Sequence, residues 1–128
     1  MPDEENIFAL VGEEGFRKLV AGFYRRVKTD ELLGKLYPPN DFDAAERRLR
    51  DFLIQRFGGP TTYSQQRGHP RLRMRHAPFL VDLAARNRWV DLMEQAMAEA
   101  ALAPEIDMVF RKYFHDTATA MINTQAGA

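Results

Sequence analysis

Apolar residues recur every three to four positions over most of the chain, which is the spacing of one buried face on an α-helix. The pattern is clear between Glu14 and Lys28, where the apolar positions are Phe16, Leu19, Val20, Phe23 and Val27. A second long stripe follows Pro104 and runs from Ile106 to Met121. The pattern predicts an all-α fold.

Residues that start or end helices divide this pattern into segments. Gly12 ends a short first helix, and Asp30 caps a short segment after the second. Asp43 and Glu46 have the spacing of a capping box, which predicts that a helix begins there. The predicted helices cover residues 3–12, 14–28 and 43–57, a stretch that begins at Asp82 or Asn87, and a last stretch that begins at Pro104.

Two consecutive segments in the middle of the chain lack the helical pattern. Residues 58–70 are dense in Gly, Pro, Ser and Thr and predict a long loop, which is more often functional than idle. Residues 71–79 alternate arginine with other side chains, a period of two that is typical of a strand. Because no second strand is predicted to pair with them, we interpret them as a short, irregular helix. We expect one domain over residues 1–128, with residues 1–6 and 124–128 frayed.

Composition excludes several classes of protein. Lys plus Arg and Asp plus Glu are 18 each, so the net charge is zero, whereas nucleic-acid binders are usually basic. The absence of cysteine excludes disulfides and thiolate-bound metals, and is compatible with a reducing cytosol. The acidic start is not typical of a signal peptide, and no apolar run is long enough to span a membrane. We therefore expect a cytoplasmic protein with neither a nucleic-acid nor a membrane partner.

Three histidines are the candidate metal ligands. We expect His115 to face solvent, opposite the apolar stripe of the last helix, and His69 to be exposed in the loop. His76 has apolar neighbours, but such a histidine is more often a core residue than a ligand, and spacing does not decide between the two. Zinc is disfavoured because no second ligand lies at a compact spacing beside His76. A metal with one protein ligand must bring its other ligands with it, as haem does.

Arginine and aromatic side chains add candidates that composition alone leaves open. The arginines beside His76 are interpreted as a solvated basic patch or as the counter-charge of an anionic ligand, and composition favours the first; they are Arg67, Arg71, Arg73 and Arg75. Tyr24, Tyr37 and Trp89 are each more often core residues than ligand contacts. Together they indicate a polar spot inside an apolar cavity, because their hydroxyls and indole N–H require partners.

The chain resembles the truncated haemoglobins of the second group, found in bacteria and plants. The strongest likeness is the run from Arg67 through Gly68-His69-Pro70 to Phe79, preceded by Gly58-Gly59-Pro60 and Tyr63-Ser64. Further matches in order and spacing are Phe23-Tyr24, Leu36-Tyr37-Pro38, residues 45–49 and Arg88-Trp89, so that the resemblance covers residues 7–123. One departure is Gly12-Glu13, where family members often have two glycines; it puts the first inter-helix turn in question.

The resemblance implies a two-over-two helical sandwich around haem b, with His76 as the proximal ligand of the iron. It places Tyr24, Tyr37 and Trp89 on the opposite side, where gas ligands bind, with Ala45 and Leu49 lining the same pocket. The remaining haem contacts that it implies are Arg48, Arg73 and Arg75, as partners of the propionates, and Phe52, Leu72 and Met74.

The implied function is reversible binding of O₂, CO and NO at ferrous haem. Because Ala45 cannot donate a hydrogen bond, the tyrosines and Trp89 are expected to hold O₂ and release it slowly. Slow release favours redox chemistry or sensing over transport. The alternatives are a haem enzyme, either an NO dioxygenase or peroxidase-like, that depends on a separate reductase, and a haem-free helical interaction module. The sequence leaves a monomer or a homodimer open.

Overall fold

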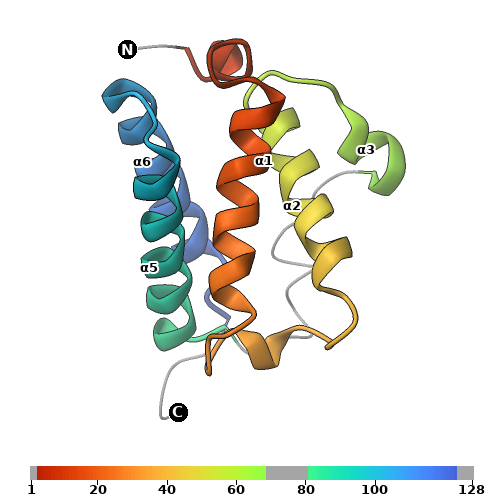
Figure 1. The fold of residues 1–128 in the computed structure, drawn as a ribbon, viewed down its shortest axis with the longest axis vertical. Coiled ribbons are helices and arrows are strands. Elements are labelled where there is room, and N and C mark those ends of the chain that lie inside the picture. Colours follow the sequence, from red (N-terminus) through yellow and green to blue (C-terminus); the bar gives the residue numbers. More distant parts are fainter. Residues whose placement is uncertain (1–2, 69–80, 124–128) are drawn as a thin grey trace.

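The computed structural model describes residues 3–68 and 81–123, and every regular element in these parts is a helix (Figure 1). The α-helices of the described parts are α1 (Ile7–Val27), α2 (Phe42–Arg56), α3 (Thr62–Arg67), α5 (Leu83–Ala100) and α6 (Pro104–Ala120). Two 3-10 turns, η1 (Glu4–Asn6) and η2 (Gly34–Leu36), precede α1 and α2. The predicted all-α fold is confirmed.

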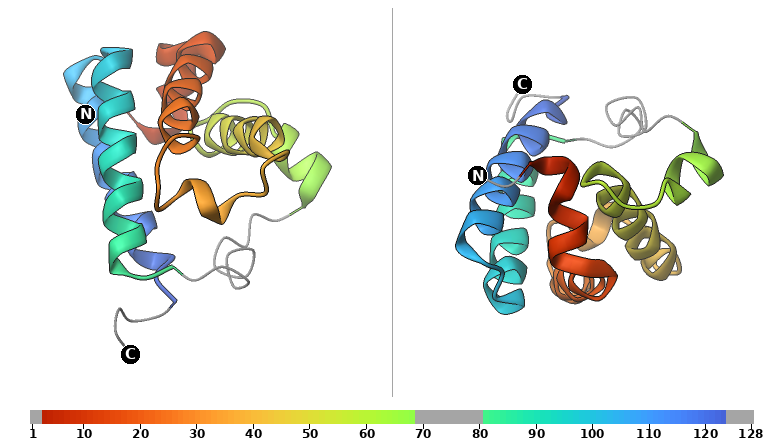
Figure 2. Two further views of the ribbon diagram at one scale, coloured as in Figure 1. Left: turned by 60° about the horizontal axis from the view of Figure 1, so that its bottom comes forward. Right: turned by 90° about the horizontal axis from the view of Figure 1, so that it is seen from above.

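Helix α1 lies in the middle of the molecule, with α2 and α3 on one side and α5 and α6 on the other (Figures 1 and 2). It packs against both α2 and α5, while α3 packs against α2 and α6 against α5. Since each of these helices carries one apolar face, the apolar faces of α1, α2, α5 and α6 meet in a shared interior.

Phenylalanine rings form the part of this interior that holds three helical segments together. Phe16 of α1, Phe57 at the end of α2 and Phe110 of α6 are fully buried. The Phe57 and Phe110 ring centroids are 4.8 Å apart, and those of Phe16 and Phe110 are 5.7 Å apart. Burying each ring stabilises the fold by roughly 1.5–3 kcal/mol, so this cluster anchors α1 and α6 to the end of α2.

Gly12 interrupts α1 where the sequence predicts a break. Its φ of +78° and ψ of 162° are non-helical, and the φ lies in the region that L side chains rarely adopt. The helix therefore consists of a short first part and a long second part, as predicted. Glu13, at the position of the family's second glycine, is helical, so a single glycine is enough for this turn.

A second glycine allows the end of α2 to approach the start of the chain. Gly58 has φ +96°, and a Cβ atom there would overlap the Glu5 carbonyl. Beside it, the Phe8 N–H donates to the Phe57 carbonyl at 2.8 Å. This contact fixes the short first part of α1 against the α2 end.

Two predictions about element boundaries are wrong. Helix α2 begins at Phe42, so the capping box at Asp43 and Glu46 does not form, and Asp43 lies in the first turn. Residues 62–67 form α3 instead of a loop. The reason is a tertiary contact, because the Gln55 side chain accepts from the Ser64 N–H at 2.9 Å and donates to the Ser64 hydroxyl at 2.7 Å.

Two other boundaries agree with the sequence. Asp82 caps α5, since its Oδ1 accepts from the Ala85 N–H at 2.8 Å, and Pro104 opens α6. The irregular helix predicted for residues 71–79 lies outside the described residues. Among the helices described, none combines the length and the apolar character needed to cross a bilayer.

Candidate ligand pocket

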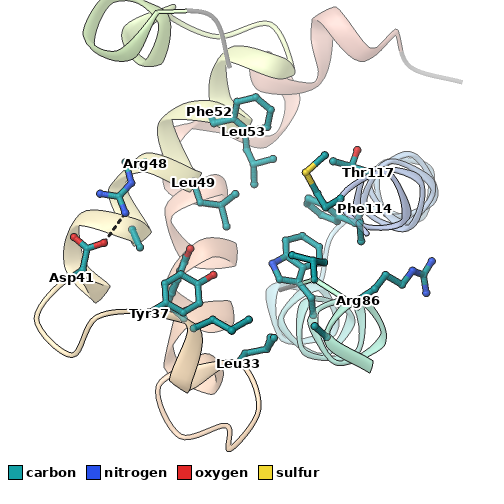
Figure 3. Close-up of a pocket in the computed structure, with 18 of the residues that line it drawn as sticks. Leu33, Tyr37, Asp41, Arg48, Leu49, Phe52, Leu53, Arg86, Phe114 and Thr117 are labelled. Atoms are coloured by element: carbon teal, nitrogen blue, oxygen red, sulfur yellow. Dashed lines mark hydrogen bonds and ion pairs between the residues drawn. The ribbon is translucent and has the colours of Figure 1, made fainter. Parts of the chain in front are cut away.

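A cavity of about 420 Å³ lies between α1, α2, α5 and α6 (Figure 3). Its walls are mostly apolar, and most of them come from α2 on one side and from α5 and α6 on the other. The apolar lining includes Leu33, Leu36, Leu49, Phe52, Leu53, Val81, Ala85, Phe114, Ala118 and Met121. The size and character are those of a small-molecule site.

Two tyrosines form a polar spot in this lining. The Tyr24 and Tyr37 rings meet edge to face with centroids 5.6 Å apart, and Figure 3 shows the Tyr37 hydroxyl directed into the cavity. Burial raises the pKa of Tyr24 well above its usual value, and the neighbouring Tyr37 raises it further through its charge and a hydrogen bond. Burial also raises the pKa of Tyr37. Both hydroxyls therefore keep their protons at neutral pH; one proton is used in the bond between the two tyrosines, and the other hydroxyl can donate to a ligand.

Trp89 lines the opposite wall, from α5. Its ring lies between Phe23, with centroids 5.0 Å apart, and Phe114, with centroids 5.6 Å apart. Within the described residues no hydrogen bond reaches its indole N–H. The two neighbouring rings thus hold the indole in the cavity lining.

The wall from α2 presents residues spaced at three and four along the helix. Ala45 is 4% exposed and lines the cavity together with Leu49 and Phe52. Because Ala45 carries no polar atom in its side chain, this wall offers no hydrogen bond at that point. The polar contributions come from Arg48 and from Asp41, at the start of the helix.

Arg48 lies at the edge of the cavity and pairs with Asp41 at 2.8 Å (Figure 3). The hydrogen bond from Arg48 is the largest cause that lowers the Asp41 pKa, and the charge of Arg67 also lowers it. Both partners of the pair are about one-third exposed, which places the pair at the rim. The sequence predicts Arg48 at this site but misses Asp41, although the spacing of seven residues, two helical turns, is a readable signal.

Sequence reasoning also misses polar and aromatic side chains from α3 and α6. Tyr63 of α3 lines the cavity and meets the Phe52 ring edge to face at 5.4 Å. Tyr113 and Thr117 of α6 are further lining residues. Tyr113 and Thr117 belong to the apolar stripe after Pro104. Their hydroxyl groups within a buried stripe are the feature of the sequence that indicates a polar contact there.

The remaining predicted site residues are His76, Leu72, Arg73, Met74 and Arg75, and they lie outside the described residues, as does His69. His115 is described, and it pairs with two charged residues of α5. It is half-exposed, its Nε2 lies 2.5 Å from Glu94 Oε1, and its Nδ1 lies 3.3 Å from Arg86 Nη2. It is not part of the cavity lining.

The lining suits a largely apolar ligand that carries an anionic group at one edge. Apolar walls would cover the face of such a ligand, and Arg48 at the rim can donate to a carboxylate. The Tyr24–Tyr37 pair and the Trp89 N–H are the neutral donors that a small polar molecule beside it could meet. Within residues 3–68 and 81–123 no cluster of three or more acidic, His or Cys side chains gathers to hold a bare metal ion.

Comparison with known proteins agrees with this geometry. A family model described as bacterial-like globin matches residues 6–123. A group 2 truncated hemoglobin of Bacillus subtilis is 35% identical over 116 residues, which cover 91% of this chain and 87% of that protein. The solved hemoglobin of Chloroflexus aurantiacus has a TM-score of 0.89 at 44% identity, covering 92% of this chain and 98% of its own. The group II truncated hemoglobin of Bacillus anthracis has a TM-score of 0.88 at 33% identity, covering 92% and 96%.

Proposed function

Because the chain belongs to the bacterial-like globin family and is a haem-binding globin, we propose that it carries one haem b in the described cavity, with His76 as the protein ligand. The family binds small gas ligands such as O₂, and the similarity to truncated haemoglobins expected from the sequence is confirmed. The absence of cysteine excludes attachment of the haem through thioether bonds, and we propose that it is held noncovalently.

The observation that supports this proposal is the lining of the cavity. Its apolar walls from α2, α5 and α6 match the apolar faces of a porphyrin, and Phe52 and Leu53 lie on one of them (Figure 3). Arg48 at the rim can pair with a propionate through the donors of its guanidinium that Asp41 does not use. The residues present therefore fit haem. His115 bonds to Glu94 outside the cavity. Of the other two histidines, His69 and His76, the resemblance assigns His76 to the iron.

When bound, haem supplies an iron centre with one coordination position open to O₂, CO or NO. Around that position the chain provides two donors at a time, the Trp89 N–H and one hydroxyl of the hydrogen-bonded Tyr24–Tyr37 pair. The Tyr24 and Tyr37 hydroxyls stay protonated because burial raises both pKa values, and the Trp89 N–H cannot accept a proton in any state. Hydrogen bonds from these groups hold a ligand that carries partial negative charge.

This set of donors favours slow release of O₂. We therefore propose that the protein uses its bound gas for redox chemistry or sensing more than for transport. We further propose that a separate reductase supplies electrons to the haem. The protein is expected to be either a monomer or a homodimer. The comparisons do not favour the alternative of a dedicated haem enzyme.

Absorption spectra of the purified protein test this function. We expect one equivalent of haem per chain, a ferrous form that changes its visible bands on adding O₂ and again on adding CO, and full reversal when the gas is removed. A protein that takes up no haem from solution, or whose ferrous spectrum is unaffected by both gases, would refute the proposal.

A further inference from the structure

Two hydrogen bonds join the end of α6 to the chain just before α5. The Val81 N–H donates to the Asn123 side-chain Oδ1 at 2.9 Å, and the Asn123 backbone N–H donates to the Val81 carbonyl at 2.8 Å. A single residue thus satisfies both backbone polar groups of another residue 42 positions away. We refer to this pair of bonds as the Val81–Asn123 clamp.

The clamp lies at the wall of the cavity. Val81 is only 8% exposed and lines the cavity, as do Ala118 and Met121 from α6. Buried backbone groups require a partner, since water cannot reach them. The clamp therefore provides the partners that allow Val81 to be buried in this wall, beside the residues of α6.

The end of α6, which lies just before Asn123 in the chain, is itself bonded to α5. Arg86 of α5 donates through Nε to the Thr119 hydroxyl at 3.1 Å and through Nη2 to the His115 carbonyl at 3.3 Å. These bonds tie the last turns of α6 to the first turn of α5, and Figure 2 shows the two ends side by side. Asn123 is thus presented to Val81 from a fixed position.

From this geometry we propose that Asn123 is a positioning residue that holds Val81 in the pocket wall and thereby slows the escape of haem. In chain order Val81 directly follows residues 69–80, which include the proposed ligand His76. The inference rests on the proposed haem site. The side-chain oxygen of Asn123 thus controls how long haem is retained, in addition to any role in folding.

Three variants separate this role from a general loss of stability. Asn123→Ala removes the side-chain acceptor, whereas Asn123→Asp keeps an oxygen at the same place. Gln95→Ala is the control, because the Gln95 amide bonds the exposed Asp91 on the surface of α5. The measurements are haem transfer from the ferric protein to excess apomyoglobin, and hydrogen exchange of the Val81 amide by NMR, which reports the clamp directly.

We expect Asn123→Ala to lose haem roughly three- to ten-fold faster than wild type, the effect of one buried hydrogen bond, with faster exchange at Val81. Asn123→Asp and Gln95→Ala should both stay close to wild type. Unchanged haem loss in Asn123→Ala despite faster Val81 exchange would overturn the inference, as would equal acceleration in the Ala and Asp variants. Failure of the wild-type protein to bind haem would instead refute the proposed function, and this inference with it.

Discussion

Replacing Trp89 by phenylalanine removes one hydrogen-bond donor from the cavity and leaves an aromatic ring in its place. The native indole lies between Phe23 and Phe114, with centroids 5.0 and 5.6 Å away. Because a phenyl ring can keep both of these contacts, the variant should fold normally. The main loss is the indole N–H, which can donate but cannot accept.

The expected magnitude follows from the charge on the ligand. O₂ bound to ferrous haem draws electron density from the iron, so a hydrogen bond to it is partly charge-assisted. Losing such a bond costs about 1.5–3 kcal/mol, which corresponds to O₂ release that is faster by roughly ten- to hundred-fold. CO develops less negative charge, so its release should change less. Tyr24 and Tyr37 keep their hydroxyls in this variant and retain part of the hold on O₂.

Stopped-flow measurement of O₂ and CO release in the same variant separates hydrogen bonding from bulk. Phe114→Leu is the matched control, because the smaller side chain enlarges the cavity beside Trp89 without removing a hydrogen-bond donor. We expect that control to alter the two gases by similar, small factors. If Trp89→Phe accelerates both gases equally, Trp89 acts by filling space, and if it alters neither, Trp89 has no part in holding the ligand.

Further substitutions test access, charge and stability. Ala45→Leu should slow CO association by narrowing the cavity beside α2, and a rate equal to wild type in flash photolysis would place the entry route elsewhere. Arg48 lowers the Asp41 pKa, so this carboxylate stabilises the fold above its usual pKa and loses the effect as pH falls through the lowered value. Asp41→Asn should therefore reduce the melting temperature at pH 7, and the reduction should shrink as the pH falls below the usual range of an Asp carboxyl. A reduction of the same size at every pH would contradict the pairing. Phe16→Ala should cost about 3–5 kcal/mol of unfolding free energy in urea, because the ring is fully buried against Phe110; a cost below about 1 kcal/mol would refute its place in the core.

The sequence predicts those parts of the fold that local patterns determine. Helices α1, α5 and α6 each bury a continuous apolar stripe, and Gly12 and Asp82 mark boundaries through backbone freedom and capping. Helix α3 is different, because the Gln55 side chain that binds Ser64 comes from another helix, and no local pattern shows such a contact.

The same distinction applies to the pocket. Tyr24, Tyr37 and Trp89 are each more often core residues when taken singly, but together their polar groups indicate a polar spot in an apolar cavity. The resemblance adds that they share the side where gas ligands bind, and the structure places all three in one cavity lining. The partners that lie far apart in the chain were not predictable. The Val81–Asn123 clamp spans 42 positions and depends on how the end of α6 meets the start of α5.

The assignment of His76 to the haem iron is the central claim, and it is tested most directly by its removal and chemical replacement. His76→Gly should bind haem weakly and lose the ferrous and CO-bound spectra of the wild type. Added imidazole should restore both spectra, because it can occupy the space of the missing side chain and supply the same nitrogen ligand. Unchanged ferric, ferrous and CO-bound spectra in His76→Gly without imidazole would contradict the assignment.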